Sequence, residues 1–278
     1  MIVVIGGTGR VGRQVAAQLR QRNLPVRVVS RGLNLAEVPP GTEVARADLA
    51  DPASLEPQLA GARALFLVWP FTSPELTAGL APKVVEIAAR HARRVVYLSA
   101  QPAADQPGSF WALVERAIED SGVCWTFLRP TGFAANTLMW ADQIRSGNVV
   151  RWPFGAAARA LIDERDIAAV AVRALTKDGH AGARYLLSGP AVLTQAEQLA
   201  AIGQAIGREL RWEELPRQTA LQELTTAWGD PAFAQTALDA WEWFVDHPET
   251  VTSVVQDITG APAHSFPDWA AANAAAFR

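Results

Sequence analysis

Cysteine is almost absent from this 278-residue chain. Cys124 stands alone, so the chain by itself can form no disulfide and no multi-cysteine metal site. The four histidines are scattered without the spacing of metal ligands, and we expect surface positions for them and no bound metal. No apolar run reaches the length of a membrane span, and the first residues lack the charged segment and cleavage site of a signal peptide. These absences predict a cytoplasmic protein with no membrane partner.

An excess of positive charge is also missing, and lysine and tyrosine are scarce. With 25 Lys and Arg against 28 Asp and Glu, the net charge is −3, so we expect no nucleic-acid partner. The only lysines are Lys83 and Lys177, and the only tyrosines are Tyr97 and Tyr185. The scarcity of these two residue types limits the proton-transfer chemistry that the chain can use.

Short apolar runs alternate with amphipathic segments through the first half of the chain. This alternation is typical of βαβ units on a parallel sheet. The predicted strands cover residues 2–5, 25–30, a short run from 44, 64–68, 94–99 and 124–128. The predicted helices cover residues 11–22, a segment capped by Asp51, 75–91 and 110–121. We therefore predict an α/β fold with a Rossmann-type, doubly wound parallel sheet.

The pattern changes after residue 130. We expect helices over 134–146, from a cap at Asp163 to 175, and over 194–206, with strands at 149–152, 184–187 and 210–213. The tail from Pro216 is helical and rich in tryptophan, which fits a lid or a dimer contact equally well. These features predict a smaller, mainly helical C-terminal substrate lobe, in a monomer or a homodimer.

A glycine-rich loop joins the first strand to the first helix. Its sequence is Gly6-Gly7-Thr8-Gly9-Arg10-Val11-Gly12, with glycines at every third position from Gly6. Gly6 permits a tight turn, Gly9 lets a pyrophosphate approach the backbone, and Gly12 allows close packing of helix on strand. The helix N-terminus supplies free N–H groups to the phosphates, so the loop predicts a dinucleotide site.

The loop spacing resembles the short-chain dehydrogenase/reductase superfamily, and in particular its atypical, NmrA-like branch. Three later stretches are similar to that family: 46–51, 125–133 and 162–168. The resemblance covers about residues 1–190. It implies that Asp48 contacts the adenine and that the segment after residue 129 lies beside the nicotinamide.

The end of the second predicted strand favours NADP(H) over NAD(H). NAD-specific sites usually place an acidic residue there, whereas this chain has Ser30 and Arg31. Arg31 can pair with a 2′-phosphate, Ser30 can donate to it, and Arg10 can reach it from the loop.

We predict an NADP-binding Rossmann domain over 1–155, and over 156–278 a mixed region that completes the sheet and forms the substrate lobe. The expected cofactor residues are Gly6, Thr8, Gly9, Arg10, Val11, Gly12, Ser30, Arg31, Asp48, Leu49, Val68, Trp69, Pro70, Ser99, Pro130, Thr131 and Phe133.

The superfamily's usual catalytic pair is missing. The resemblance implies a Tyr-x-x-x-Lys pair on the helix after the fifth strand, but residues 110–116 contain neither Tyr nor Lys. Glu115 on that helix reads as a solvated residue. The catalytic residues are therefore unknown, and three alternatives stay open. The proton comes from water or the substrate, another side chain donates it, or the protein senses the dinucleotide without turnover.

Aromatic and amide side chains follow the later strands. We expect the substrate site to include Gln101, Phe110, Trp111, Asn136 and Trp140. Aromatic walls favour a planar aromatic ligand, and the two amides could orient an oxygen. The leading hypothesis is an NADPH-dependent reductase (ketoreductase or quinone reductase type) acting on an aromatic or polycyclic ketone or quinone. The alternative is an NmrA-type redox-sensing regulator that binds NADP.

Overall fold

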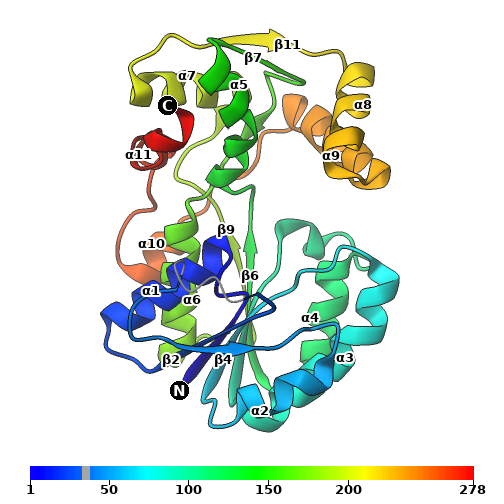
Figure 1. Ribbon diagram of the computed structural model, residues 1–278, viewed down its shortest axis with the longest axis vertical. Coiled ribbons are helices and arrows are strands. Elements are labelled where there is room, and N and C mark those ends of the chain that lie inside the picture. Colours follow the sequence, from blue (N-terminus) through cyan, green and yellow to red (C-terminus); the bar gives the residue numbers. More distant parts are fainter. Residues whose placement is uncertain (33–37) are drawn as a thin grey trace. The chain divides into compact units, whose positions relative to one another are not determined.

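A seven-stranded parallel sheet is the largest element of the computed structural model, which describes residues 1–32 and 38–278. Its strand order is β3-β2-β1-β4-β5-β6-β9 (Figure 1). The strands are β1 (Ile2–Ile5), β2 (Val26–Ser30), β3 (Glu43–Arg46), β4 (Ala64–Val68), β5 (Arg94–Leu98), β6 (Cys124–Pro130) and β9 (Ala183–Leu187). The predicted doubly wound α/β fold is confirmed.

Helices cover both faces of this sheet. Figure 1 shows α1 (Arg10–Gln21) and α6 (Glu164–Thr176) on one side, and α3 (Pro74–His91) and α4 (Phe110–Asp120) on the other. Every second strand residue points toward α3 and α4, so that one face of the sheet forms a continuous apolar core with them. Shorter helical segments complete this layer arrangement: η2 (Pro52–Leu55), α2 (Glu56–Leu59), η3 (Gln101–Ala104) and α10 (Val254–Thr259).

The chain forms two compact units that are discontinuous in sequence. The first unit comprises residues 1–130, 164–187 and 254–261, and therefore contains the whole parallel sheet. The second comprises residues 131–163, 188–253 and 262–278. The domain boundary near residue 155 remains a prediction from the sequence.

The second unit is mainly helical and has its own tryptophan-rich core. Trp140 meets Trp212 edge to face at 5.5 Å between ring centroids, and Trp152 lies 5.6 Å from Trp241. Two short strand pairs tie the unit together, β7 with β11 in parallel and β8 with β10 antiparallel. Its elements are η4 (Ala134–Trp140), α5 (Ala141–Ser146), β7 (Val149–Trp152), β8 (Ala158–Arg159), β10 (Leu193–Thr194), α7 (Gln195–Ile206), β11 (Arg211–Glu214), α8 (Arg217–Trp228), α9 (Pro231–Asp246), α11 (Phe266–Ala272) and η5 (Ala274–Phe277).

Several local predictions need correction. The predicted helix over 134–146 begins as a 3₁₀ helix and becomes α-helical only at α5. Asp51 does not cap the following helix with its side chain; its carbonyl oxygen instead accepts a hydrogen bond from the Ser54 hydroxyl. Two of the four histidines are partly buried rather than fully exposed. His91 is half-buried against Glu56, and His180 is half-buried with its Nδ1 2.9 Å from a tyrosine hydroxyl.

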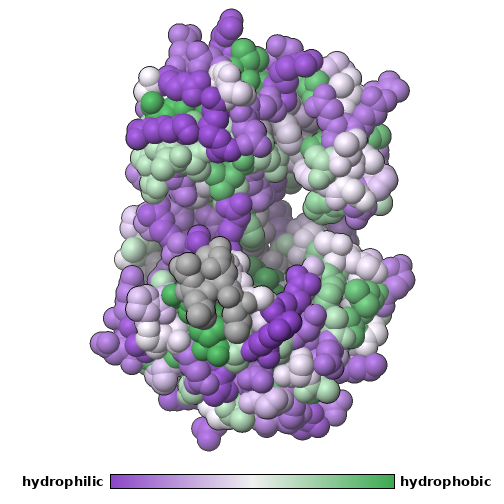
Figure 2. Space-filling view, viewed as in Figure 1, coloured by the Kyte–Doolittle hydropathy of each residue, from purple (hydrophilic) through white to green (hydrophobic). Residues whose placement is uncertain are grey.

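The viewed face of the molecule in Figure 2 shows hydrophobic side chains in small groups between hydrophilic ones. Large apolar side chains that are exposed include Met139 on η4, and Phe233 and Trp243 on α9. Within residues 1–32 and 38–278, no helix combines the length and apolar character needed to cross a bilayer.

Candidate functional site: a dinucleotide cradle and an aromatic pocket

The glycine loop lies where the strand order of the sheet reverses. β1 pairs with β2 on one side and β4 on the other, and ligands of open α/β sheets bind at such a switch point. Gly6 has φ +78°, and a Cβ built on it would lie 2.9 Å from the Cβ of Val68 at the end of β4. A side chain at position 6 would therefore be strained and would collide with the neighbouring strand.

The loop presents bare backbone to the start of α1. Gly9 caps α1 without a side-chain hydrogen bond, and the first turn of the helix has no acidic residue. The first N–H groups of a helix have no acceptor within it, so these donors and the positive end of the helix dipole are available to a phosphate. A Cβ on Gly12 would lie 2.3 Å from the Gly6 carbonyl oxygen, which keeps helix and loop in close contact.

Gly7 is a site residue that sequence reasoning missed. A Cβ on Gly7 would approach both γ-methyl groups of Val28 to 2.7 Å, so only glycine lets the loop pack this closely on β2. The Gly6-Gly7 pair in the sequence could have indicated this close packing, but the every-third-residue spacing assigns roles only to Gly6, Gly9 and Gly12.

Ser30 and Thr8 meet at the end of β2. Their hydroxyl oxygens are 3.1 Å apart, and this hydrogen bond ties the glycine loop to the second strand. Arg31 and Arg10 follow these residues and are both exposed. Two hydroxyls meet here near two exposed arginines, and residues 29–32 at the end of β2 include no acidic residue.

The loop after β3 is organised by Asp48. Its Oδ1 accepts the backbone N–H of Ala50 at 2.9 Å, and its backbone N–H donates to the Ser54 hydroxyl at 3.0 Å. Asp48 is half-buried, whereas the adjacent Leu49 is only 4% exposed and packs in the core beside the sheet. The local turn leaves the second carboxylate oxygen of Asp48 without a partner in these hydrogen bonds.

The remaining predicted cofactor residues of the first unit stand at the carboxyl ends of β4, β5 and β6. Trp69 is buried, with its indole Nε1–H donating to Thr77 at 2.9 Å, and Pro70 beside it is exposed. Ser99 is 3% exposed, and its hydroxyl has no hydrogen-bond partner among the described residues. Pro130 is buried as the last residue of β6. Parallel strands end at one edge of a sheet, so these residues share the edge that holds the glycine loop.

The helix that carries the catalytic pair in the superfamily is α4. Gln101 lies just before it on η3, and Phe110 and Trp111 begin it with ring centroids 4.0 Å apart. The sequence suggested that Glu115 is solvated, but the residue is only 4% exposed. Its two carboxylate oxygens accept hydrogen bonds from the guanidinium of Arg129. The prediction failed because a charged residue on an amphipathic helix is expected on the solvent face, and the sequence does not show that Arg129 pairs with it.

Tyr97 is the one tyrosine in the core of the sheet, and it is fully closed off. Its side chain is 0% exposed and its hydroxyl has no partner within the described part of the chain. Burial raises the pKa of this phenol well above its ordinary value, and the nearby charge of Glu115 raises the pKa further. Tyr97 is therefore a neutral phenol with no access to a bound substrate.

Thr131, Phe133, Asn136 and Trp140 belong to the second unit. Thr131 donates its hydroxyl proton to the Ala160 carbonyl at 2.6 Å, and Phe133 forms a β-bridge with Ile162. These contacts fix the start of the second unit on the segment that follows β8.

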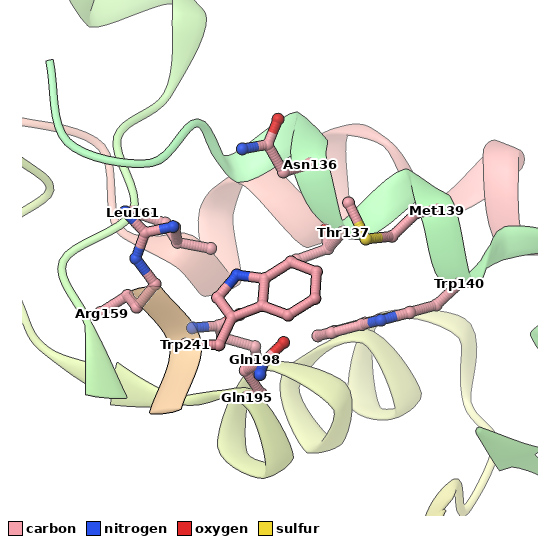
Figure 3. Close-up of a pocket in the computed structure, with 9 residues that line it drawn as sticks. All are labelled: Asn136, Thr137, Met139, Trp140, Arg159, Leu161, Gln195, Gln198 and Trp241. Atoms are coloured by element: carbon pink, nitrogen blue, oxygen red, sulfur yellow. The ribbon is translucent and has the colours of Figure 1, made fainter. Parts of the chain in front are cut away.

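A small pocket lies within the second unit, and it contains two of the predicted substrate residues, Asn136 and Trp140. Figure 3 shows the Trp241 indole in the middle, with Arg159 and Leu161 on one side and Met139 and Trp140 on the other. The pocket is partly open to solvent and has a volume of about 40 Å³. The lining residues are Asn136, Thr137, Met139, Trp140, Arg159, Leu161, Gln195, Gln198 and Trp241. Arg159, the two glutamines and Trp241 were not predicted, because nothing in a single sequence marks residues this far apart as neighbours.

A family match decides the identity of the first unit. Residues 6–178 match the model of a family described as NAD(P)H-binding, and the cradle described above has the bare backbone that a dinucleotide diphosphate requires. The chain belongs to this NAD(P)H-binding family. The predicted NAD(P)-binding family is confirmed.

This NAD(P)H-binding protein has full-length relatives among reductases. It is 39% identical to a (4-alkanoyl-5-oxo-2,5-dihydrofuran-3-yl)methyl phosphate reductase of Streptomyces griseus, covering 100% of this chain and 99% of the relative. It is 34% identical to an NAD(P)H azoreductase of Xenophilus azovorans, again over 100% of this chain and 99% of the relative. The chain is an NAD(P)-dependent oxidoreductase, as the sequence predicted.

Solved structures share the fold of this oxidoreductase. Triphenylmethane reductase of Citrobacter in complex with NADP(H) matches with a TM-score of 0.82 and 19% identity, covering 99% of this chain and 100% of that one. An NADPH-dependent quinone oxidoreductase of Escherichia coli in complex with NADPH matches with a TM-score of 0.80 and 22% identity, covering 98% and 99%. At these identities the likeness concerns the fold alone.

Proposed function

We propose that this protein is an NADPH-dependent reductase of planar aromatic ketones or quinones that works without the Tyr/Lys pair of its superfamily. The observation that carries the proposal is the end of β2, where Thr8 and Ser30 are hydrogen-bonded beside exposed Arg31 and residues 29–32 include no acidic residue. Hydroxyl and guanidinium donors suit a 2′-phosphate, whereas a ribose 2′-hydroxyl is usually held by Asp or Glu.

The cofactor residues follow from this arrangement. The N–H groups at the start of α1 would bind the diphosphate, with Gly6, Gly9 and Gly12 keeping side chains away from it. Arg31, Ser30 and Arg10 would bind the 2′-phosphate. Asp48 would accept from the adenine amino group through its second carboxylate oxygen. The ends of β4, β5 and β6 would then hold the nicotinamide half, with Val68, Ser99 and Pro130.

The mechanism has no protein acid in the usual place. A bound NADPH supplies a hydride to the acceptor. The chain's own residues position the two reactants, which by itself removes much of the barrier of a bimolecular step. Tyr97 is sealed in the core and neither lysine lies on α4, so we assign the proton to water or to the acceptor itself. Quinones suit this chemistry, because the reduced oxygen is a weak base that water can protonate.

The names of the two relatives bear on the acceptor class. One is an azoreductase, and the other is a reductase of a ring-bearing carbonyl compound that also carries an alkanoyl group and a phosphate. The aromatic pocket of the second unit provides indole faces on which a planar ring can stack.

The experiment is an assay of NADPH oxidation, followed at the nicotinamide absorbance, with a panel of quinones, aromatic ketones and azo dyes. We expect turnover with at least one quinone and a preference for NADPH over NADH of more than roughly tenfold in kcat/KM. Tight binding of NADPH in calorimetry with no turnover on any acceptor would overturn the reductase proposal and favour a redox-sensing regulator. If calorimetry detects binding of neither NADPH nor NADH, the cofactor assignment fails as well.

A further inference from the structure

An ion pair with a fully buried carboxylate borders the pocket of the second unit. Arg159, at the end of β8, points its Nη2 at Oε1 of Glu249 with a separation of 2.5 Å. The Glu249 side chain is 0% exposed, and its other oxygen accepts the backbone N–H of Ala160 at 3.0 Å. Both oxygens of Glu249 therefore have a donor, and its charge balances that of Arg159.

The guanidinium of Arg159 is only partly used by this pair. Its Nε–H is buried and has no acceptor among the described residues, although a buried N–H without a partner costs free energy. The ring of Phe244 lies 4.6 Å from the guanidinium carbon, which covers one face of the group. Arg159 also lines the pocket (Figure 3). The Nε–H is closed off even from water, so the donor that a ligand would meet is Nη1, for which the described residues supply no acceptor and which is not buried.

The two glutamines of the pocket are held in place by the backbone. The amide nitrogen of Gln195 donates to the carbonyl oxygens of Pro153 and Phe154, and that of Gln198 donates to the carbonyl of Leu193. Both glutamines are buried. These bonds fix the pocket floor, and they leave Arg159 as the strongest N–H donor of the pocket that the described residues do not satisfy.

We propose that the Arg159–Glu249 pair is the oxygen-recognition element of the acceptor pocket, and that it selects a neutral carbonyl oxygen over an anionic group. This inference rests on the proposed function for the identity of the ligand as an acceptor. The pair has no net charge, and an anion placed beside the Glu249 carboxylate would be repelled in a weakly solvated site. A carbonyl oxygen needs one N–H donor and brings no charge.

The size of the pocket fits this assignment. A space of about 40 Å³ has room for roughly three waters, or for a carbonyl group with the adjoining edge of its ring. The rest of a planar acceptor would then lie against Trp241 and the exposed Met139 at the mouth, where indole and thioether favour an aromatic surface. The substrate class is a neutral, conjugated, ring-bearing carbonyl compound.

Binding is tested without NADPH, by quenching of tryptophan fluorescence with anthraquinone and with anthraquinone sulfonate. Anthraquinone does not add to thiols, so the exposed Cys124 does not interfere. We expect the wild type to bind anthraquinone more tightly than its sulfonate. The double variant Arg159→Met/Glu249→Gln removes both charges and the donor together, and we expect it to bind anthraquinone roughly tenfold more weakly.

Two further variants make the test specific. Arg151 and Glu213 form an exposed pair in the same unit, 57% and 55% exposed, and Arg151→Met/Glu213→Gln serves as the matched control with unchanged binding. Glu249→Gln leaves the guanidinium charge unbalanced, so we expect its preference to shift toward the sulfonate.

The inference is overturned if the double variant, folded by its circular dichroism and melting temperature, binds anthraquinone as tightly as the wild type. A wild-type preference for the sulfonate would overturn it too. The two proposals fail separately. If the wild type reduces quinones but the double variant binds anthraquinone as tightly as the wild type, only the Arg159 assignment is rejected. If the double variant binds anthraquinone more weakly but the wild type oxidises no NADPH with any acceptor, only the reductase proposal is rejected.

Discussion

Glu115 and Arg129 join α4 to the end of β6 through two hydrogen bonds, from Arg129 Nε at 2.9 Å and from Nη2 at 2.5 Å. The Glu115 side chain is 6% exposed and that of Arg129 16%, so the pair is largely shielded from water. The hydrogen bond to Glu115 raises the pKa of Arg129, and the carboxylate charge adds to this effect. α4 thus carries a structural ion pair, directly before Pro130 at the edge of the nucleotide cradle. It is the helix on which the short-chain dehydrogenases/reductases, which the sequence resembles, place catalytic groups.

Removing one partner of this pair is expected to be costly. Glu115→Ala leaves the Arg129 guanidinium buried without its carboxylate, and we expect a loss of about 3–5 kcal/mol in the free energy of unfolding. The double variant Glu115→Leu/Arg129→Met replaces both charges with apolar groups and is expected to recover most of that loss. Urea unfolding followed by circular dichroism measures both; equal stability of the two variants would contradict the ion-pair explanation.

The glycine loop gives a prediction with a matched control. Gly12→Ala places a methyl group 2.3 Å from the Gly6 carbonyl oxygen, so we expect a loss of about 1–3 kcal/mol in stability and weaker NADPH binding. Gly79 lies on α3, where an added Cβ would meet no described atom within 4 Å, and Gly79→Ala should stabilise the helix by about 1 kcal/mol. Melting temperatures and NADPH titrations of both variants make the comparison, and a Gly12→Ala protein that behaves like Gly79→Ala would refute the role of close packing.

Tyr97 provides a test of the mechanism. Tyr97→Phe removes a buried hydroxyl that has no partner among the described residues, so we expect stability to stay level or to rise by up to about 1 kcal/mol. Since the hydroxyl is closed off from substrate, kcat and its pH profile should be unchanged. A fall in kcat of about 100-fold, the usual contribution of a general acid, would show that Tyr97 reaches the acceptor after all.

The sheet was predictable because its signal is local. Most strands of the first half are short apolar runs such as 64–68, and the glycine loop predicts both its turn and the helix that follows. The second unit was harder to predict, since it is assembled from three separate stretches and its short strands pair residues such as Arg211 and Val149 over long sequence distances. Burial of Glu115 and the pairing of Arg159 with Glu249 depend on such long-range contacts. A single sequence shows a charge and its helix position, but not the partner that allows it to be buried.

Stability in acid is expected to depend on the start of α7. Thr194 accepts the N–H of Glu197, and the Glu197 carboxylate accepts the N–H of Thr194, which lowers the pKa of Glu197. A carboxyl with a lowered folded-state pKa stabilises the fold above its unfolded pKa and loses that contribution as the pH falls through the folded value. Thr194→Ala should cost about 1 kcal/mol at neutral pH. The stability difference between wild type and Glu197→Gln should shrink as the pH falls below about 4.3, the unfolded value for Glu. A difference that stays constant in urea titrations carried well below that pH would contradict this account.

Cofactor preference is expected to reverse at the end of β2. Arg31→Asp removes a guanidinium from the proposed 2′-phosphate site and supplies the carboxylate that holds a ribose 2′-hydroxyl in NAD-specific enzymes. We expect the dissociation constant for NADPH to rise roughly 10- to 100-fold, while that for NADH stays level or falls. Arg63→Asp makes the same charge change at an exposed position just before β4, where the amino ends of the parallel strands lie. It is the control for net charge. Calorimetric titration of both variants with both nucleotides measures the dissociation constants. If Arg31→Asp weakens NADPH and NADH binding equally, or if the two variants change NADPH binding equally, Arg31 does not bind the 2′-phosphate.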